Sequence, residues 1–225
     1  PPATWVSSLV QGFEKNVGLV AGYSPYSLKR LFIDPKRSLL ASLLRDFIQY
    51  EEFKGATWSA GSIGLNRGWL CTGRSLAYRR TVYDEVGGFE NIKHSVSGDD
   101  DLFLQMVRRD TTWQIRYVTS PRSYVPTYPP PSFRAFVEQR KRHFSAAKYY
   151  PARMKVIFGL IHLYNGLAVL MVATCPSVGI PALAGKLTID SYLFYKGTAI
   201  FGNKRLRWWL APLEIAAILY NTVVG

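Results

Sequence analysis

Three consecutive aspartates, Asp99, Asp100 and Asp101, are the side chains of this sequence with the clearest potential for chemistry. They follow Gly98 and begin a run that predicts a helix over residues 99–109. At a helix N-terminus, free N–H groups and the helix dipole favour ionised carboxylates. An ionised carboxylate held there can serve as a general base. The same spacing also fits an acidic cap with a solvated first turn, or a Mg²⁺ or Mn²⁺ site made by Asp99 and Asp101.

A second candidate group is the basic run Gln139-Arg140-Lys141-Arg142-His143, within a predicted helix over residues 133–149. Gln139 and Arg142 lie three positions apart and therefore share a helix face. The planar guanidinium of arginine suits phosphate oxygens, so this face could bind a diphosphate. The alternative is a basic amphipathic helix attracted to anionic lipid headgroups.

Composition and charge narrow the class of protein. Among the 225 residues, 48% are apolar and 14% aromatic, which excludes a disordered chain, and only two are cysteines, which excludes a disulfide scaffold. The net charge of +13 would be typical of a protein that binds nucleic acid. However, the basic residues from Arg134 to Lys155 end where an uncharged stretch, residues 156–185, begins. That stretch exceeds the roughly 20 residues that cross a bilayer. The basic residues before it are therefore predicted to flank a membrane span, and no nucleic-acid partner is expected.

Charge alternation along the C-terminal third predicts a membrane topology. The predicted spans are residues 156–174, 180–201 and 208–224. The turn between the first two, residues 175–179, carries no charge, whereas basic residues precede the first and third spans. The positive-inside rule then puts residues 1–155 in the cytoplasm. The alternative is a soluble all-α domain in which these helices are buried.

The region before the predicted spans is expected to be mixed α/β, from the spacing of its apolar residues. Helices are predicted over residues 6–13, 39–53, 81–86 and 99–109. Strands are predicted over residues 17–23, 76–78 and 113–118. Residues 55–68 are rich in Gly and Ser and predict a loop.

Read in order, four motifs and the spans that follow them resemble the second half of a membrane-bound glycosyltransferase of family 2. The motifs are Cys71-Thr72-Gly73-Arg74-Ser75-Leu76-Ala77-Tyr78-Arg79-Arg80, Val86-Gly87-Gly88-Phe89-Glu90, Gly98-Asp99-Asp100-Asp101-Leu102 and Gln139-x-x-Arg142-His143. Their combination and order carry the resemblance, which covers most of residues 1–155.

The resemblance implies an α/β fold: a partial GT-A (Rossmann-like) domain that lacks its N-terminal nucleotide-binding half, followed by two or three transmembrane helices. The expected domains are 1–132, the C-terminal part of the catalytic domain; 133–155, a basic interfacial helix; and 156–225, the membrane region. The divalent metal (Mg²⁺ or Mn²⁺) of the family is expected for the full-length protein, because its Asp-x-Asp motif is not found in this chain. These residues alone are therefore expected to be inactive.

The activity implied is that of an inverting, hexosyltransferase-like enzyme of polysaccharide biosynthesis. It would move a sugar from a nucleotide-sugar donor to a glycan or lipid-linked acceptor at the cytoplasmic face of the lipid bilayer. By resemblance, the base is Asp99, with Asp100 as the alternative. The donor diphosphate would be bound by Gln139, Arg142 and His143, and the acceptor by Thr72, Gly73, Gly88, Phe89 and Asp101. Family members that build polymers carry Trp at the position of His143, so processive synthesis is not expected.

Two other classes compete with this interpretation. A non-catalytic, membrane-anchored basic binding module would need none of the aspartates. A transporter fragment would account for Lys186, Asp190 and Glu214, which interrupt the apolar runs.

Overall fold

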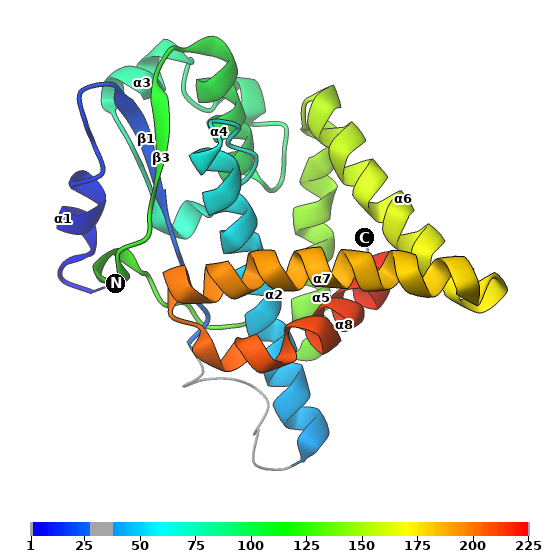
Figure 1. The fold of residues 1–225 in the computed structure, drawn as a ribbon. Helices are drawn as coiled ribbons and strands as arrows, with labels where there is room; N and C mark the ends of the chain where they lie inside the picture. The colour runs from blue at the N-terminus through cyan, green and yellow to red at the C-terminus, as the bar shows by residue number, and fades with distance from the viewer. Residues whose placement is uncertain (1, 28–37, 225) are drawn as a thin grey trace. The chain divides into compact units, whose positions relative to one another are not determined.

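The computed structural model describes residues 2–27 and 38–224, which form two compact units (Figure 1). Of these residues, unit 1 contains 2–27 and 52–150, and unit 2 contains 38–51 and 151–224. Unit 1 is mixed α/β, as predicted, and unit 2 is helical.

Unit 1 is built on a three-stranded sheet. Its strands are β1 (Val17–Gly22), β2 (Leu76–Tyr78) and β3 (Gln114–Val118), in the order β2-β1-β3. β1 is antiparallel to β2 and parallel to β3. All of β1 is buried, as expected for an apolar run that forms the central strand. The three strands predicted from the sequence are therefore confirmed.

Helices cover both faces of this sheet. On one face, Leu9 of α1 (Trp5–Val10) packs with Val17 and Val20 of β1. On the other lies α4 (Asp99–Asp110), whose residues from Leu102 to Val107 are buried (Figure 1). α4 carries acids in its first turn and arginines in its last, which complements the helix dipole. The short helix α3 (Arg80–Glu85) follows β2.

The predicted loop over residues 55–68 is wrong, because α2 (Leu39–Gly64) continues through most of it. The hydroxyls of Thr57 and Ser59 donate to carbonyl oxygens four residues earlier in the helix, at 3.0 and 2.9 Å. The polar side chains are thereby satisfied inside the helix, and Ala56 and Ile63 are buried. Burial of one helix face outweighs the low helix propensity of Gly and Ser.

The last part of unit 1 is the predicted basic helix. α5 (Phe133–Ser145) begins at Ser132, whose hydroxyl caps the helix by accepting from the N–H of Ala135 at 3.1 Å. Phe136 is fully buried and anchors the helix. A 3₁₀ turn, η5 (Ala146–Tyr149), completes the predicted range.

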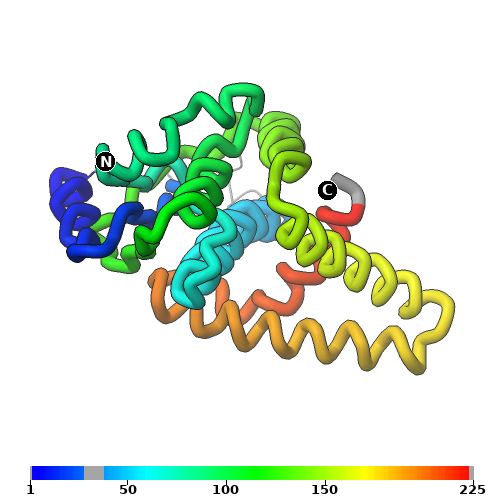
Figure 2. Tube along the Cα trace, turned by 90° about the horizontal axis from the view of Figure 1, so that it is seen from above, coloured from blue at the N-terminus to red at the C-terminus, as the bar shows by residue number. Residues whose placement is uncertain are grey.

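Unit 2 contains α6 (Ala152–Thr174), α7 (Pro176–Phe201), the 3₁₀ segment η6 (Lys204–Trp209) and α8 (Leu210–Val224). α6 and α7 form an antiparallel hairpin (Figure 2). The predicted five-residue turn shrinks to Cys175, since α7 begins at Pro176. Gly179 lies inside α7, where a Cβ would come within 2.2 Å of the backbone nitrogen of Val172. The lack of a side chain at Gly179 therefore allows α6 and α7 to approach each other closely.

α6 is the one helix among the described residues that is long and apolar enough to cross a membrane, judged by length and composition, which by itself is weak evidence. Only 11% of its most apolar window is buried within the protein. Its exposed side chains include Leu160, Leu163 and Leu170.

Three charged residues of α7 and α8 are paired with one another, in what we call the Lys186 cluster (Tyr50, Lys186, Asp190 and Glu214). The Lys186 ammonium contacts the carboxylate of Asp190 and lies 2.9 Å from Oε1 of Glu214. The hydroxyl of Tyr50, on α2, donates to Oε2 of Glu214 at 2.7 Å. These contacts join α2, α7 and α8, and they account for these charges as packing contacts.

Candidate active site

The candidate site lies at the N-terminus of α4. Gly98 precedes the helix with φ = 75°, in the left-handed region that favours glycine. A Cβ at Gly98 would lie 2.6 Å from the Cβ of Ala146 in η5. The loop before the aspartates therefore packs directly on the segment that follows α5. Ala146 comes four residues after Arg142, about 6 Å along a helix.

Both carboxylate oxygens of Asp101 accept hydrogen bonds from other parts of unit 1. Its Oδ1 accepts from the backbone N–H of Cys71 at 2.7 Å, and its Oδ2 accepts from the hydroxyl of Tyr150 at 2.6 Å. Burial raises the pKa of Asp101 to about 8, and the neighbouring charge of Asp100 acts in the same direction. With both oxygens engaged, Asp101 fastens the start of α4 to the loop at residue 71 and to the end of η5.

Asp100 is also engaged. Its Oδ2 accepts from the N–H of Gly73 at 2.7 Å, and its Oδ1 from the N–H of Asp101 at 2.9 Å. Burial raises the pKa of Asp100, and these two hydrogen bonds oppose the shift. The predicted acceptor-binding pair Thr72-Gly73 therefore lies directly against α4.

Asp99 differs from its two neighbours. It is exposed, and no hydrogen bond or ion pair to its side chain occurs within the described part of the chain. Its charge reaches the aromatic side chains beside α4, because it helps to raise the pKa of Tyr78, after burial and after Tyr83. Asp99 is thus the one carboxylate of the three that remains open to a substrate.

The three aspartates do not form a metal site. Asp100 and Asp101 direct their oxygens to separate backbone and hydroxyl donors. Over residues 2–27 and 38–224, no group of three or more His, Cys, Asp or Glu side chains could hold a metal ion. The geometry thus gives no support to the spacing-based hypothesis of a Mg²⁺ or Mn²⁺ site at Asp99 and Asp101, and the divalent metal implied by the resemblance has no fitting ligands here.

Gly88 and Phe89 belong to a turn and an aromatic cluster near the same helix. Gly88 has φ = 61°, and a Cβ there would lie 2.7 Å from the ring of Tyr83. Phe89 is 37% exposed and makes edge contacts with Tyr78, Tyr83 and Phe103 at centroid distances of 6.5, 5.4 and 5.3 Å. The cluster gives unit 1 a partly exposed aromatic surface.

The basic run of α5 presents its residues in different environments. Gln139 is half-buried and its Oε1 accepts from the hydroxyl of Tyr26 at 3.2 Å. Arg142 is exposed. His143 is on the surface, where partial desolvation lowers its pKa to about 4, helped by Arg140, Arg142 and Arg74. A neutral His143 at physiological pH can accept or donate a hydrogen bond without adding charge.

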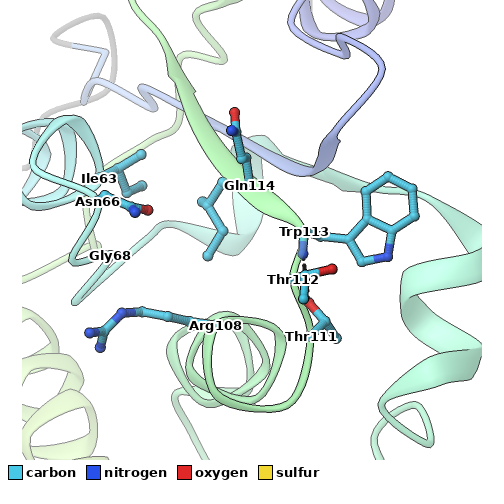
Figure 3. Close-up of a pocket in the computed structure, with 9 residues that line it drawn as sticks. Ile63, Asn66, Gly68, Arg108, Thr111, Thr112, Trp113 and Gln114 are labelled. Atoms are coloured by element: carbon cyan, nitrogen blue, oxygen red, sulfur yellow. Dashed lines mark hydrogen bonds between the residues drawn. The ribbon is translucent and has the colours of Figure 1, made fainter.

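A separate pocket of about 400 Å³ lies at the opposite end of α4 (Figure 3). Arg108 and the segment Thr111–Ile115 form one side, and Ile63, Asn66 and Gly68 form the other. Arg108 is nine residues from Asp99, about 14 Å along the helix. None of the predicted site residues lines this pocket.

Sequence reasoning did not find three residues that support the site, namely Tyr150, Arg74 and Glu52. Tyr150 holds Asp101, and Arg74 contacts Glu52 at 2.5 Å. Arg74 lies inside a recognised motif, which was a usable signal. Glu52 and Tyr150 carry no local pattern, since their partners lie 22 and 49 positions away.

The chain matches the family described as "Glycosyl transferase family group 2" over residues 52–223, and it belongs to that family. The match spans the aspartates, α5 and the helices of unit 2. No curated protein and no solved structure matches the chain. The family supports glycosyl transfer in general and does not favour the binding-module or transporter alternatives.

Proposed function

We propose that this protein is an inverting glycosyltransferase that uses a nucleotide-sugar donor and a glycan or lipid-linked acceptor, with Asp99 as the catalytic base. The observation that carries the proposal is the contrast among three adjacent carboxylates. Asp100 and Asp101 are held by hydrogen bonds, whereas Asp99 is exposed at the helix N-terminus.

The proposed reaction needs a proton acceptor. As the acceptor hydroxyl attacks the anomeric carbon, the new C–O bond forms, the bond to the donor diphosphate breaks, and the hydroxyl proton passes to Asp99. The helix dipole at the start of α4 favours the ionised form of that carboxylate. The leaving nucleoside diphosphate would gain stabilisation from Arg142 and Gln139.

The aromatic cluster at Phe89 suits the acceptor side of this reaction. Its partly exposed ring belongs to the group that includes Tyr78, and the Asp99 charge acts on Tyr78. Aromatic faces offer apolar contact to the C–H groups of a sugar, so a sugar held there would place a hydroxyl near Asp99.

We further propose that unit 2 holds the enzyme in a bilayer with unit 1 cytoplasmic. The hairpin of α6 and α7 has basic residues at one end, Lys155 before α6 becomes apolar and Lys204 after α7, and an uncharged turn at Cys175. This asymmetry follows the positive-inside rule. A membrane-impermeant thiol reagent should label Cys175 only from the outside, and Lys204→Cys in a Cys175→Ser background only from the cytoplasmic side.

The deciding experiment measures sugar transfer by the full-length protein in membrane vesicles, with Asp99→Asn beside Asp100→Asn. Loss of a general base typically costs 10²- to 10⁴-fold in rate, so Asp99→Asn should lower kcat by about that factor while the protein still inserts in the membrane. Asp100→Asn should retain much more activity. Unchanged transfer by Asp99→Asn would refute the assignment of the base.

A further inference from the structure

A largely buried carboxylate of α2, that of Glu52, contacts two arginines that are distant from each other in sequence. Oε1 of Glu52 lies 2.5 Å from the guanidinium of Arg74, and its Oε2 lies 4.0 Å from that of Arg140. The Glu52 side chain is 11% exposed and that of Arg140 is 16% exposed. Arg74 belongs to η2 (Gly73–Ser75), next to the loop that contacts Asp100, and Arg140 belongs to α5.

Further contacts hold the Arg74 side chain in position. Its Nε donates to the hydroxyl of Ser24 at 2.9 Å, and that hydroxyl donates to the carbonyl of Val125 at 2.7 Å. Its guanidinium also lies 5.8 Å from the ring centroid of Tyr26. Because the hydroxyl of Tyr26 donates to Gln139, the contacts of Arg74 extend to the predicted diphosphate-binding face of α5.

The charges in this cluster are unbalanced. Within residues 2–27 and 38–224, the Glu52 carboxylate contacts the guanidinium groups of both Arg74 and Arg140, and Arg142 follows half a turn further along α5. The fields of all three arginines reach His143, whose pKa they help to lower. A net positive charge remains after Glu52 is counted, which attracts an anionic group such as a diphosphate.

We infer that Glu52 is a positioning residue for the transferase reaction: it holds Arg74 and Arg140 in place so that Gln139 and Arg142 meet the donor diphosphate in one fixed arrangement. This inference rests on the proposed function. Glu52 itself is not expected to touch the donor. It acts by keeping two guanidinium groups on protein partners, so that they neither move nor compete for the ligand.

This role predicts opposite changes in binding and turnover for Glu52→Gln. With the negative charge gone, the site becomes more positive, and a nucleoside diphosphate should bind more tightly, by at most about fivefold, which is the effect of one unit charge 4 Å away in water, because Glu52 lies further than that from the donor. At the same time, less fixed arginines should lower kcat by on the order of 10- to 100-fold, since small misplacements are costly to catalysis. Mere loss of stability would weaken binding instead.

The experiment uses the full-length protein in vesicles, with activity normalised to folded protein and with binding of a nucleoside diphosphate measured separately. Glu14→Gln is the matched control, because Glu14 pairs with Arg116 on the surface of the same unit, outside the recognised motifs, and its side chain is 64% exposed. That variant should leave both quantities unchanged.

A double-mutant cycle tests whether Glu52 acts on kcat through Arg74. If Glu52 acts through Arg74, the variant Glu52→Gln/Arg74→Gln should be no slower than Arg74→Gln alone. This neutral pair also serves if Glu52→Gln by itself folds poorly. Additive losses of kcat, or a Glu52→Gln variant that matches Glu14→Gln in both binding and kcat, would overturn the inference. Absence of sugar transfer by the unsubstituted protein would instead refute the proposed function.

Discussion

The α4 aspartates (Asp99–Asp101) in unit 1 and the Lys186 cluster in unit 2 are both groups of acidic side chains, and they are arranged in opposite ways. In the Lys186 cluster, Asp190 and Glu214 share one ammonium, and Glu214 also accepts from Tyr50. Among the α4 aspartates, two carboxylates are satisfied by neutral donors and the third, Asp99, is exposed.

This difference in pairing indicates a structural role for the acids of the Lys186 cluster and a chemical role for Asp99. A buried carboxylate that has lost water requires a partner, so each acid of the Lys186 cluster is costly to disturb. An exposed carboxylate at a helix N-terminus is stabilised without one and stays free to take a proton. Substitution in the Lys186 cluster should therefore affect stability, and substitution of Asp99 should affect turnover.

The largest expected loss of stability comes from Lys186→Met. It leaves the buried carboxylate of Glu214 and the half-buried carboxylate of Asp190 without their cation and should lower the free energy of unfolding by about 3 kcal/mol. Thermal unfolding of the full-length protein in detergent would measure this. The triple variant Lys186→Met/Asp190→Asn/Glu214→Gln removes all three charges and should recover most of the loss. A loss below about 1 kcal/mol in the single variant would show that the cluster is hydrated.

Gly98→Ala should have the next largest effect. Alanine at φ = 75° is strained, and its Cβ would lie 2.6 Å from that of Ala146, so we expect a loss of about 1–3 kcal/mol. Because Gly98 precedes Asp99, kcat should also fall. Gly61→Ala is the matched control: Gly61 lies inside α2 with open space around its Cβ, and alanine there should stabilise the protein by up to about 1 kcal/mol. Equal effects of the two variants would contradict the packing at Gly98.

Asp101→Asn should change the pH dependence of stability more than the stability itself. The folded pKa of Asp101 is about 8, above that of an unfolded aspartate, so the folded state favours the protonated form. Folding stability from this group is therefore greatest below about pH 4 and decreases as the pH rises towards 8. Asparagine keeps an acceptor for Cys71 and a donor for Tyr150 but does not titrate. Denaturant unfolding from pH 4 to 8 should show a weaker decline for the variant, and an identical decline would contradict the assignment.

The smallest change of stability is expected for Asp99→Asn. The exposed side chain has no partner in the described residues, so the free energy of unfolding should stay within about 0.5 kcal/mol. Comparing its thermal unfolding with its sugar transfer sharpens the contrast between the two units. A loss of several kcal/mol would show that Asp99 is a structural residue and would remove the argument for a base.

Local patterns in the sequence predicted much of unit 1. The apolar run of β1 and the acidic start of α4 were recognisable because neighbouring residues define them. The second half of α2 was not, since its Gly and Ser residues indicate a loop until tertiary burial is known. The continuity of α7 from Pro176 was missed for a related reason, as Gly179 fits closely against α6.

The sequence also indicated the aspartates and the basic face of α5, but not how they divide their roles. Asp99 and Asp100 are adjacent, and they are distinguished by burial and by the hydrogen bond of Asp100 to the N–H of Gly73, which is far away in sequence. The same holds for Glu52, whose contacts with Arg74 and Arg140 come from long-range folding. Side chains that act through distant partners leave no periodic signal.

Tyr50 and Glu52 stand two positions apart on one continuous helix, yet their hydrogen bonds belong to different units. Each residue of a helix is turned by about 100° from the one before it. Tyr50 and Glu52 therefore lie about 200° apart around α2. Less than one turn of a single helix thus contributes a hydrogen bond to each unit, so fraying of α2 at these positions would cost both units a contact.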